Sequence, residues 1–297
     1  MNSLRRLLRL VQGNKQRVRP HSTWRHQEYI SASQPVIIGG CGRSGTTLLR
    51  AILDSHPEFC CGTESNLFLA RSIRPRVLAE WFDIPAETIG ELLDSSQSQS
   101  LFIDKFFELY AQQCGKSRWA EKTPDNIRYI PWIFEHFPNA RFIHVIRDGR
   151  DVVCSLRTHP RYEIIDGKRV ERKTLNPLDG CIDRWLETVP MGLKWRDDRR
   201  VLEVKYEDLI GEPELTLKRL FDFLDAKWHL EVLEFHKKQT NSRDAERNPQ
   251  HPEIAKPINA SSFGRWRLEL SNDEIALFKK RAGHQLIQLG YVDTMEW

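Results

Sequence analysis

Residues 35–47 place a short apolar run, a glycine-rich turn and the start of a helix directly after one another. The run 35–39 is typical of a buried strand, and residues 46–55 are predicted to form a helix that Pro57 ends. The turn between them, residues 39–47, reads GGCGRSGTT. Backbone N–H groups in such a turn converge on an anion, and the helix N-terminus adds the positive end of its dipole. This order of elements favours an α/β fold with an anion site at the end of the strand.

The spacing within this loop fits a Walker phosphate loop, because four residues separate Gly40 from Gly45. A nucleotide kinase needs lysine at the next position for the β- and γ-phosphates, and here Thr46 stands there. The cation lies inside the loop instead, at Arg43. The loop is therefore predicted to bind a phosphate-like group without the usual lysine. A glycine-rich turn without a ligand and a plain ATP or GTP site are the alternatives.

A second strand, residues 140–146, is followed by Arg147 and by a helix that starts near residue 150. Arg147 can present a planar guanidinium to a second anion, and Ser155, two turns along the helix, can add a hydroxyl. Alternating strands and helices predict a central, mainly parallel sheet flanked by helices. Such a sheet binds ligands beyond the carboxyl ends of its strands, which is where both motifs lie.

The other predicted elements follow from periodicity and from breaker residues. Residues 118–121 and 200–206 are predicted strands. Residues 157–178 are predicted to be a loop or mobile flap, and the polar segment 240–262 is predicted to be a loop. Helices are expected in the following ranges: 64–114 with breaks at Pro75, Pro85 and residues 95–100, then 127–137, 179–197, 212–225, 228–238 and 271–289.

Composition excludes several broad classes of protein. The 297 residues carry 45 basic and 41 acidic side chains, a balance that does not suggest nucleic-acid binding. No run approaches the roughly 18 apolar residues of a membrane span. The six cysteines show no zinc spacing and are expected to be reduced, which favours the cytoplasm. Residues 1–30 are expected to be a flexible basic tail able to contact a membrane surface weakly. Its arginines interrupt any secretory signal, and residues 31–297 are expected to form one domain.

The two anion motifs together resemble the sulfotransferases that use 3′-phosphoadenosine 5′-phosphosulfate (PAPS). The segment RSGTT, residues 43–47, is similar to the 5′-phosphosulfate loop of that family, and Arg147 with Ser155 is similar to its 3′-phosphate motif. Residues 43–57, followed by CGTE at 61–64, are most similar to protein-tyrosine sulfotransferases and their bacterial relatives. The resemblance implies a P-loop-like fold, a single sulfotransferase domain, and PAPS as the co-substrate, with 3′-phosphoadenosine 5′-phosphate (PAP) as the product.

Further site residues are implied by the resemblance alone. Glu64 falls on the catalytic base, and Lys122 falls on a lysine that supports the transferred sulfonate. Tyr206 matches a tyrosine near the adenine. Arg265 and Trp266 lie in a late cofactor segment, where the arginine would reach the phosphosulfate and the tryptophan would contact adenine, serve as a lid or belong to the core.

Three positions depart from the resemblance. His159 stands where the tyrosine-specific enzymes have a further 3′-phosphate arginine. Cytosolic small-molecule sulfotransferases carry tryptophan at the position of Leu48 and a catalytic histidine at that of Pro124. The acceptor class therefore does not transfer from the family.

Sulfuryl transfer needs a base, cations around the sulfonate and leaving phosphate, and a donor held in line. Arg43 and Lys122 are the expected charge-stabilising pair, and no metal is expected. The 5′-phosphate is expected on Ser44, Gly45, Thr46 and Thr47. Glu64, expected early in a helix, is the expected base, or else a partner of the helix dipole; His56, His159 and Asp125 are its rivals.

The expected acceptor is a hydroxyl of a glycan, a peptide tyrosine, a lipid or a small molecule, in a pocket built from residues 64–114 and 157–178. A metal-dependent P-loop nucleotide kinase and a catalytically inactive interaction module of the same fold are the alternatives. Lys122 has a structural alternative as well, an ion pair with Glu121 or Asp125.

Overall fold

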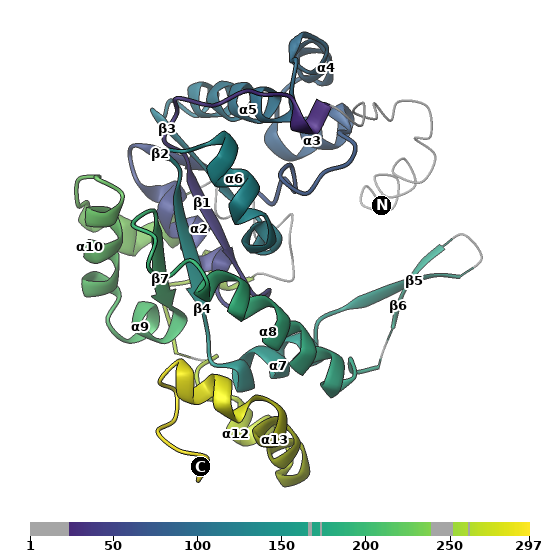
Figure 1. Ribbon diagram of the computed structural model, residues 1–297, viewed down its shortest axis with the longest axis vertical. Coiled ribbons are helices and arrows are strands. Elements are labelled where there is room, and N and C mark those ends of the chain that lie inside the picture. The colour runs from purple at the N-terminus through teal and green to yellow at the C-terminus, as the bar shows by residue number, and fades with distance from the viewer. Residues whose placement is uncertain (1–23, 166–167, 173, 239–251, 261) are drawn as a thin grey trace.

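A five-stranded parallel sheet forms the centre of the computed structural model, which describes residues 24–165, 168–172, 174–238, 252–260 and 262–297 (Figure 1). The strand order is β2-β3-β1-β4-β7. Four of these strands confirm the predicted ones and β2 was not predicted. The strands are β1 (Val36–Gly40), β2 (Phe59–Cys61), β3 (Arg118–Lys122), β4 (Arg141–Ile146) and β7 (Val201–Lys205).

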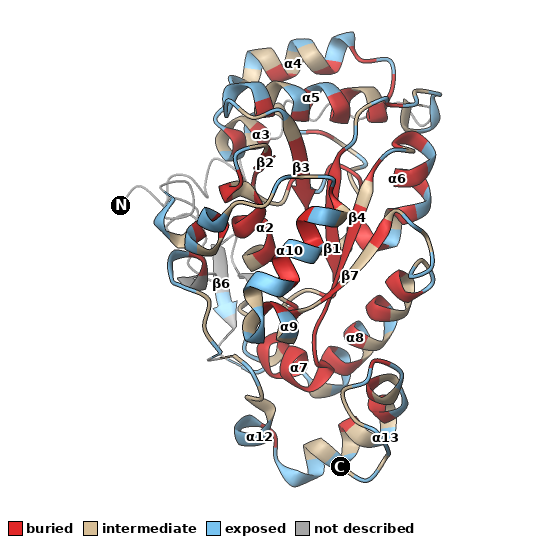
Figure 2. Ribbon diagram, turned by 90° about the vertical axis from the view of Figure 1, so that its left-hand side faces the viewer, coloured by how far each residue is buried: buried red, intermediate tan, exposed pale blue. Residues whose placement is uncertain are grey.

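The central strand β1 is buried along its whole length, because helices cover both faces of the sheet (Figure 2). Successive side chains of a strand point to opposite faces. Ile37 accordingly packs with α5 (Gln99–Gln113) and α6 (Ile130–His136), whereas Val36 and Ile38 pack with α2 (Thr46–Ser55) and α10 (Pro213–Phe223). Two hydrophobic layers therefore hold the strand that leads into the glycine-rich loop.

A third apolar cluster lies at the carboxyl end of the sheet. It joins α7 (Gly149–Arg157), α8 (Leu178–Leu193) and α13 (Asn272–Gln288) around Trp185 and Phe278. Asp148 caps α7 by accepting a hydrogen bond from the backbone N–H of Arg150, and a capping box at Ser271 begins α13. These caps fix the direction in which both helices leave the functional end of the sheet.

The segment between β2 and β3 differs from the prediction. Residues 64–74 are not helical, so the expected helix over the start of this range is wrong. Helices begin only at α3 (Pro75–Phe82), where proline occupies the first turn, and continue with α4 (Ala86–Ser95) and α5. Ser98 caps α5 by accepting from the N–H of Leu101. Strand β2 has three residues, too few to show a periodic pattern.

Residues 157–178 are not wholly loop. They contain an antiparallel hairpin of β5 (Arg161–Ile165) and β6 (Lys168–Arg172), which extends away from the sheet in Figure 1. Charged residues interrupt the apolar pattern of both strands in the sequence, so no alternation indicated them. The predicted helix at 228–238 is the 3₁₀ helix η3 (Leu230–Lys237). Within the expected loop 240–262, residues 240–251 and 261 lie outside the described residues, and η4 covers Pro252–Ala255. The remaining short elements are η2 (Pro124–Tyr129), α9 (Tyr206–Gly211) and α12 (Trp266–Glu269).

Residues 24–30, which are predicted to belong to the flexible basic tail, contact the helices beside the sheet; residues 1–23 lie outside the described residues. The short helix η1 (Trp24–His26) places Nε1 of Trp24 on the carbonyl of Ser96 at 3.0 Å. The guanidinium of Arg25 lies 5.1 Å from the ring centroid of Tyr129. All six cysteines are free thiols in the structure. Over the described residues, no helix combines the length and the hydropathy that crossing a membrane would need.

Candidate active site

The loop between β1 and α2, residues 41–45, is shaped by the glycine that ends it. Gly45 precedes α2 with a φ of 92°, which side chains rarely adopt. A Cβ atom there would lie 2.4 Å from Cδ2 of Tyr206, so no side chain fits. The N-terminus of the ten-residue helix α2 therefore opens directly onto the loop, where its dipole favours an anion.

Two buried polar atoms beside this loop have no hydrogen-bond partner within the described part of the chain. They are Oγ of Ser44, in a residue that is 0% exposed, and Nε of Arg147, in a residue that is 4% exposed. A buried donor left unpaired costs free energy, so native sites normally satisfy such atoms. Phosphate oxygens accept from both a hydroxyl and a guanidinium. The residues present therefore fit a phosphate-type anion.

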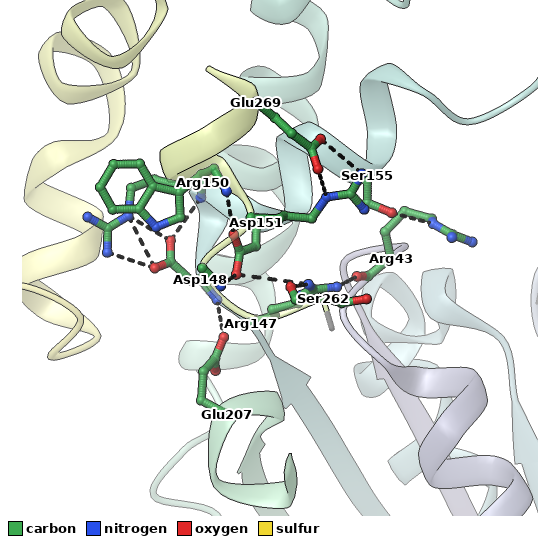
Figure 3. A network of polar contacts seen from close by, with 12 residues as sticks. Arg43, Arg147, Asp148, Arg150, Asp151, Ser155, Glu207, Ser262 and Glu269 are labelled. Carbon is green, nitrogen blue, oxygen red and sulfur yellow. Dashed lines mark hydrogen bonds and ion pairs between the residues drawn. The ribbon is translucent and has the colours of Figure 1, made fainter. Parts of the chain in front are cut away.

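The second strand end lies beside the first, as predicted. Strand β4 pairs with β1, with Val145 opposite Gly40, and Arg147 follows it. Nη1 of Arg147 donates to the carbonyl oxygen of Arg43 at 3.1 Å. The guanidinium carbon of Arg147 lies 4.3 Å from the ring centroid of Tyr206, which thus contacts both motifs. Two parallel strands bring the two predicted anion-binding motifs together (Figure 3).

Arg43 connects the loop to the helix after the second strand. Its backbone has a φ of 73°, and its Nε donates to Oγ of Ser155 at 3.0 Å. Burial lowers the pKa of Arg43, as do the positive charges of Arg147 and Arg265, whereas Glu64 raises it. Three cations near one another repel, and an anion between them would relieve that repulsion. Arg43 therefore faces Ser155 and still lies within the electrostatic reach of Glu64.

Asp151 anchors a distant segment above the second strand end (Figure 3). Its carboxylate is 1% exposed and accepts hydrogen bonds from the N–H of Gly264 at 2.7 Å and of Trp266 at 3.1 Å. Nη2 of Arg147 lies 3.9 Å from the same carboxylate and donates to the carbonyl oxygen of Ser262. Residues 262–266 are thereby held against Arg147. No role in the site is predicted for Asp151 from the sequence.

A carboxylate and a buried lysine meet on the other side of the loop. Nζ of Lys122 donates to Oε1 of Glu64 at 2.5 Å and to Oγ1 of Thr47 at 3.2 Å. The side chain of Lys122 is 3% exposed and that of Glu64 is 40% exposed. Burial lowers the pKa of Lys122, and the neighbouring Glu64 opposes that shift. A solvent-accessible carboxylate and a fixed cation therefore adjoin the N-terminus of α2.

Glu64 reaches this position from a loop after β2 and not from a helix, so its predicted placement early in a helix is wrong. The buried carboxylate of Glu121 holds that loop. Its Oε1 accepts from both N–H and Oγ of Ser65, at 3.2 and 2.8 Å, and from Oγ1 of Thr123 at 2.7 Å, while Oε2 accepts from Nδ2 of Asn126 at 2.5 Å. Glu121 is thus no partner for Lys122, and it positions the residue next to Glu64.

The sequence profile described as the sulfotransferase family matches residues 35–229. The chain belongs to the sulfotransferase family. It is 30% identical to protein-tyrosine sulfotransferase A of Caenorhabditis elegans over 282 residues, which cover 89% of this chain and 68% of that protein. It is also 30% identical to human protein-tyrosine sulfotransferase 1 over 253 residues, covering 78% of this chain and 62% of the human one.

Solved structures share the fold of this sulfotransferase. The sulfotransferase domain of the Synechococcus olefin synthase superposes with a TM-score of 0.61 at 20% identity, covering 86% of this chain and 96% of that one. A mouse sulfotransferase complexed with PAP superposes with a TM-score of 0.53 at 13% identity, covering 91% and 89% of the two chains. The predicted P-loop-like α/β fold and the predicted enzyme class are both confirmed.

The three late candidates of the sulfotransferase lie near the site in different ways. Tyr206 begins α9 and packs against Gly45, as described above. Arg265 forms a bidentate ion pair with Glu269, with N···O distances of 2.6 and 2.9 Å. The ring centroid of Trp266 lies 4.2 Å from the guanidinium carbon of Arg150. The adenine contact and the phosphosulfate contact therefore stay predictions for these residues.

The rivals for the base have less suitable positions. His56 ends α2 as its C-cap, is 0% exposed, and uses both ring nitrogens on the backbone of Lys227 and Glu58. Asp125 forms an ion pair with Arg128 at 3.2 Å. His159 lies closer to the site. Burial lowers its pKa, and so do Arg43 and Arg184, while Glu64 raises it.

Three contacts of the site have weak or no sequence signals. Glu121 stands beside Lys122, and nothing in the pattern indicates that its carboxylate points to Ser65. The carbonyl oxygen of Ser262 contacts Arg147 through the backbone, which any residue type provides. Asp151 lies four residues after Arg147, a helical spacing that could have indicated their proximity.

The structure, over the residues that it describes, contains no group of three or more His, Cys, Asp or Glu side chains arranged to hold a metal ion.

Proposed function

We propose that this sulfotransferase transfers a sulfuryl group from PAPS to an acceptor hydroxyl by in-line displacement, with Glu64 as the base. The observation that carries the proposal is the contact of Glu64 with buried Lys122, which also donates to Thr47 of the phosphate loop. PAPS supplies an activated sulfonate whose bond to the 5′-phosphate oxygen breaks as the acceptor oxygen bonds to sulfur. Glu64 takes the acceptor proton, and its partial exposure leaves room for the acceptor.

The cations of the site stabilise the charges that this transfer moves. Lys122, held between Glu64 and Thr47, can donate toward the sulfonate or the leaving oxygen. Ser44 and the N-terminus of α2 would hold the 5′-phosphate, and Arg147 with Ser155 the 3′-phosphate. A fixed 3′-phosphate subsite selects PAPS over ATP, because ATP carries no group there. The donor is thereby positioned for attack from the Glu64 side.

Compartment and contacts outside the active site are proposed on other grounds. The six free cysteines support a reducing compartment such as the cytoplasm. A weak membrane-surface contact would come from the basic residues before residue 24, which lie outside the described residues. The relatives named above suggest a hydroxylated acceptor, and the balanced charge gives no support for nucleic-acid binding.

The test separates donor binding from chemistry. Arg147→Ala is expected to weaken PAP binding about 10- to 100-fold in calorimetry, because it removes charge-assisted hydrogen bonds. Glu64→Gln is expected to retain PAP binding and lose about 10²- to 10⁴-fold in turnover of radiolabelled PAPS.

The matched controls lie at the opposite ends of the same strands. Arg141 begins β4, and Glu58 immediately precedes β2. Arg141→Ala and Glu58→Gln are both expected to keep wild-type PAP binding and turnover. Normal turnover by Glu64→Gln would remove the base assignment, and unchanged PAP binding by Arg147→Ala would remove the 3′-phosphate subsite.

A further inference from the structure

An open cleft lies between the loop that follows Glu64 and helix α3. Its volume is about 310 Å³, at the small end of the range for small-molecule sites. Buried apolar side chains form part of its wall, and Trp81, at 41% exposure, forms another part. The lining residues are Ser65, Asn66, Leu67, Leu69, Ala70, Ser72, Ile73, Arg74, Val77, Leu78 and Trp81.

One face of α3 supplies a long side of the cleft. Val77, Leu78 and Trp81 follow Arg74 at spacings of three, four and seven residues, which places all four on the same face of a helix. Seven residues of helix span about 10 Å. Arg74 is the charged member of the lining and lies at the N-cap of α3. The cleft thus offers apolar surface over about two helical turns, with a cation at the start.

The cleft begins where the proposed base is attached. Ser65 and Asn66 line it and directly follow Glu64 in the chain. Consecutive Cα atoms are about 3.8 Å apart, so the near end of the cleft lies within about 8 Å of the Glu64 backbone. The hydrogen bonds of Ser65 to Glu121 fix this relation. The near end of the cleft therefore lies close to the residue proposed as the base.

We infer that the cleft binds the apolar body of the acceptor, and that this acceptor is a small amphipathic phenol or alcohol taken from solution. The inference rests on the function proposed above. Leu69, Val77 and Trp81 offer a partly exposed apolar surface that such a molecule would cover. An acidic peptide would instead place carboxylates against this surface, whose lining carries one cation, Arg74, and burying an unpaired charge is costly.

Binding to the PAP-loaded protein tests this without requiring turnover. Calorimetry compares 4-methylphenol with 4-hexylphenol, in the presence of saturating PAP. Each buried methylene should tighten binding by about fourfold, so the longer phenol is expected to bind at least about tenfold more tightly. Val77→Asp and Trp81→Ala are expected to reduce this preference about tenfold while leaving PAP affinity within about twofold.

The control is Leu215→Asp, which introduces the same charge at an exposed apolar position on α10. It is expected to preserve the chain-length preference. Equal binding of the two phenols to the PAP-loaded protein would overturn the acceptor assignment, and so would tighter binding of a tyrosine peptide flanked by acidic residues. Absence of PAP binding by the wild-type protein would instead overturn the proposed function. The failure of the acceptor assignment and the failure of the proposed function are therefore distinguishable.

Discussion

Replacing Asp151 by asparagine keeps the shape of the side chain but removes its charge and one of its two acceptor oxygens. The carboxylate is buried and accepts from the N–H groups of Gly264 and Trp266. An asparagine can accept only one of these hydrogen bonds, and its NH₂ group would face the other donor. The substitution also removes the negative charge 3.9 Å from Nη2 of Arg147. Segment 262–266 therefore loses part of its attachment to α7.

The expected magnitude follows from these contacts. A hydrogen bond to a charged acceptor contributes about 1.5–3 kcal/mol. A loss of about 2 kcal/mol in the docking of residues 262–266 corresponds to about 30-fold in an equilibrium constant. Since docking holds Arg147 through the carbonyl oxygen of Ser262, the PAP dissociation constant of Asp151→Asn is expected to rise by up to about 30-fold. Glu64 and Lys122 lie outside this network, so turnover at saturating PAPS is expected to stay near the wild-type value.

Two assays check this reasoning independently. Calorimetry measures PAP affinity, and limited trypsin digestion reports whether Arg265 and Arg267 become accessible to cleavage. Asp183→Asn is the control, because Asp183, on the neighbouring helix α8, forms a partly exposed ion pair with Arg281 of α13. Wild-type PAP affinity together with unchanged cleavage in Asp151→Asn would refute the anchoring role.

Two further predictions concern stability. Glu121→Ala leaves the donors of Ser65, Thr123 and Asn126 unpaired in the interior, and is expected to lower the free energy of unfolding by about 3–5 kcal/mol in urea titrations; a loss below about 1 kcal/mol would contradict the positioning argument. Burial lowers the pKa of His144 to about 3, so the folded protein stays unprotonated there while the unfolded chain binds a proton below its ordinary value of 6.5. The free energy of unfolding is therefore expected to fall by about 2 kcal/mol between pH 7 and pH 5. The part of this fall that is due to His144 should be absent in His144→Leu. Equal pH dependence of the free energy of unfolding in the wild type and in His144→Leu would argue against the contribution of His144.

The parts of the site that the sequence predicts are those built from one continuous stretch of chain. The glycine loop and Arg147 each follow a strand with a clear apolar pattern, and parallel pairing brings the ends of such strands to the same edge of the sheet. The meeting of Arg147 with the loop could therefore be predicted from the residue pattern alone. Glu64 was named through a family resemblance, and its predicted local structure was wrong, because three-residue β2 left no periodic signal.

The contacts that the sequence could not predict involve backbone groups or distant segments. Arg147 and Ser262 are 115 residues apart, and the acceptor is a carbonyl oxygen that every residue carries. No residue type is required there, so no pattern marks the contact. The four hydrogen bonds of Glu121 similarly depend on the path of residues 64–66 beside β3, which only the packed sheet determines.

Gly264 is the exception within this long-range segment. Its φ of 68° lies in the region that side chains disfavour, and a Cβ atom there would lie 2.6 Å from Nη1 of Arg267. The turn that directs the N–H groups of Gly264 and Trp266 at Asp151 thus depends on glycine at this position. A glycine immediately before Arg265 and Trp266 was visible in the sequence. In this segment, therefore, only the backbone conformation at Gly264 requires a particular residue type. The charge on Asp151 then determines where the turn docks.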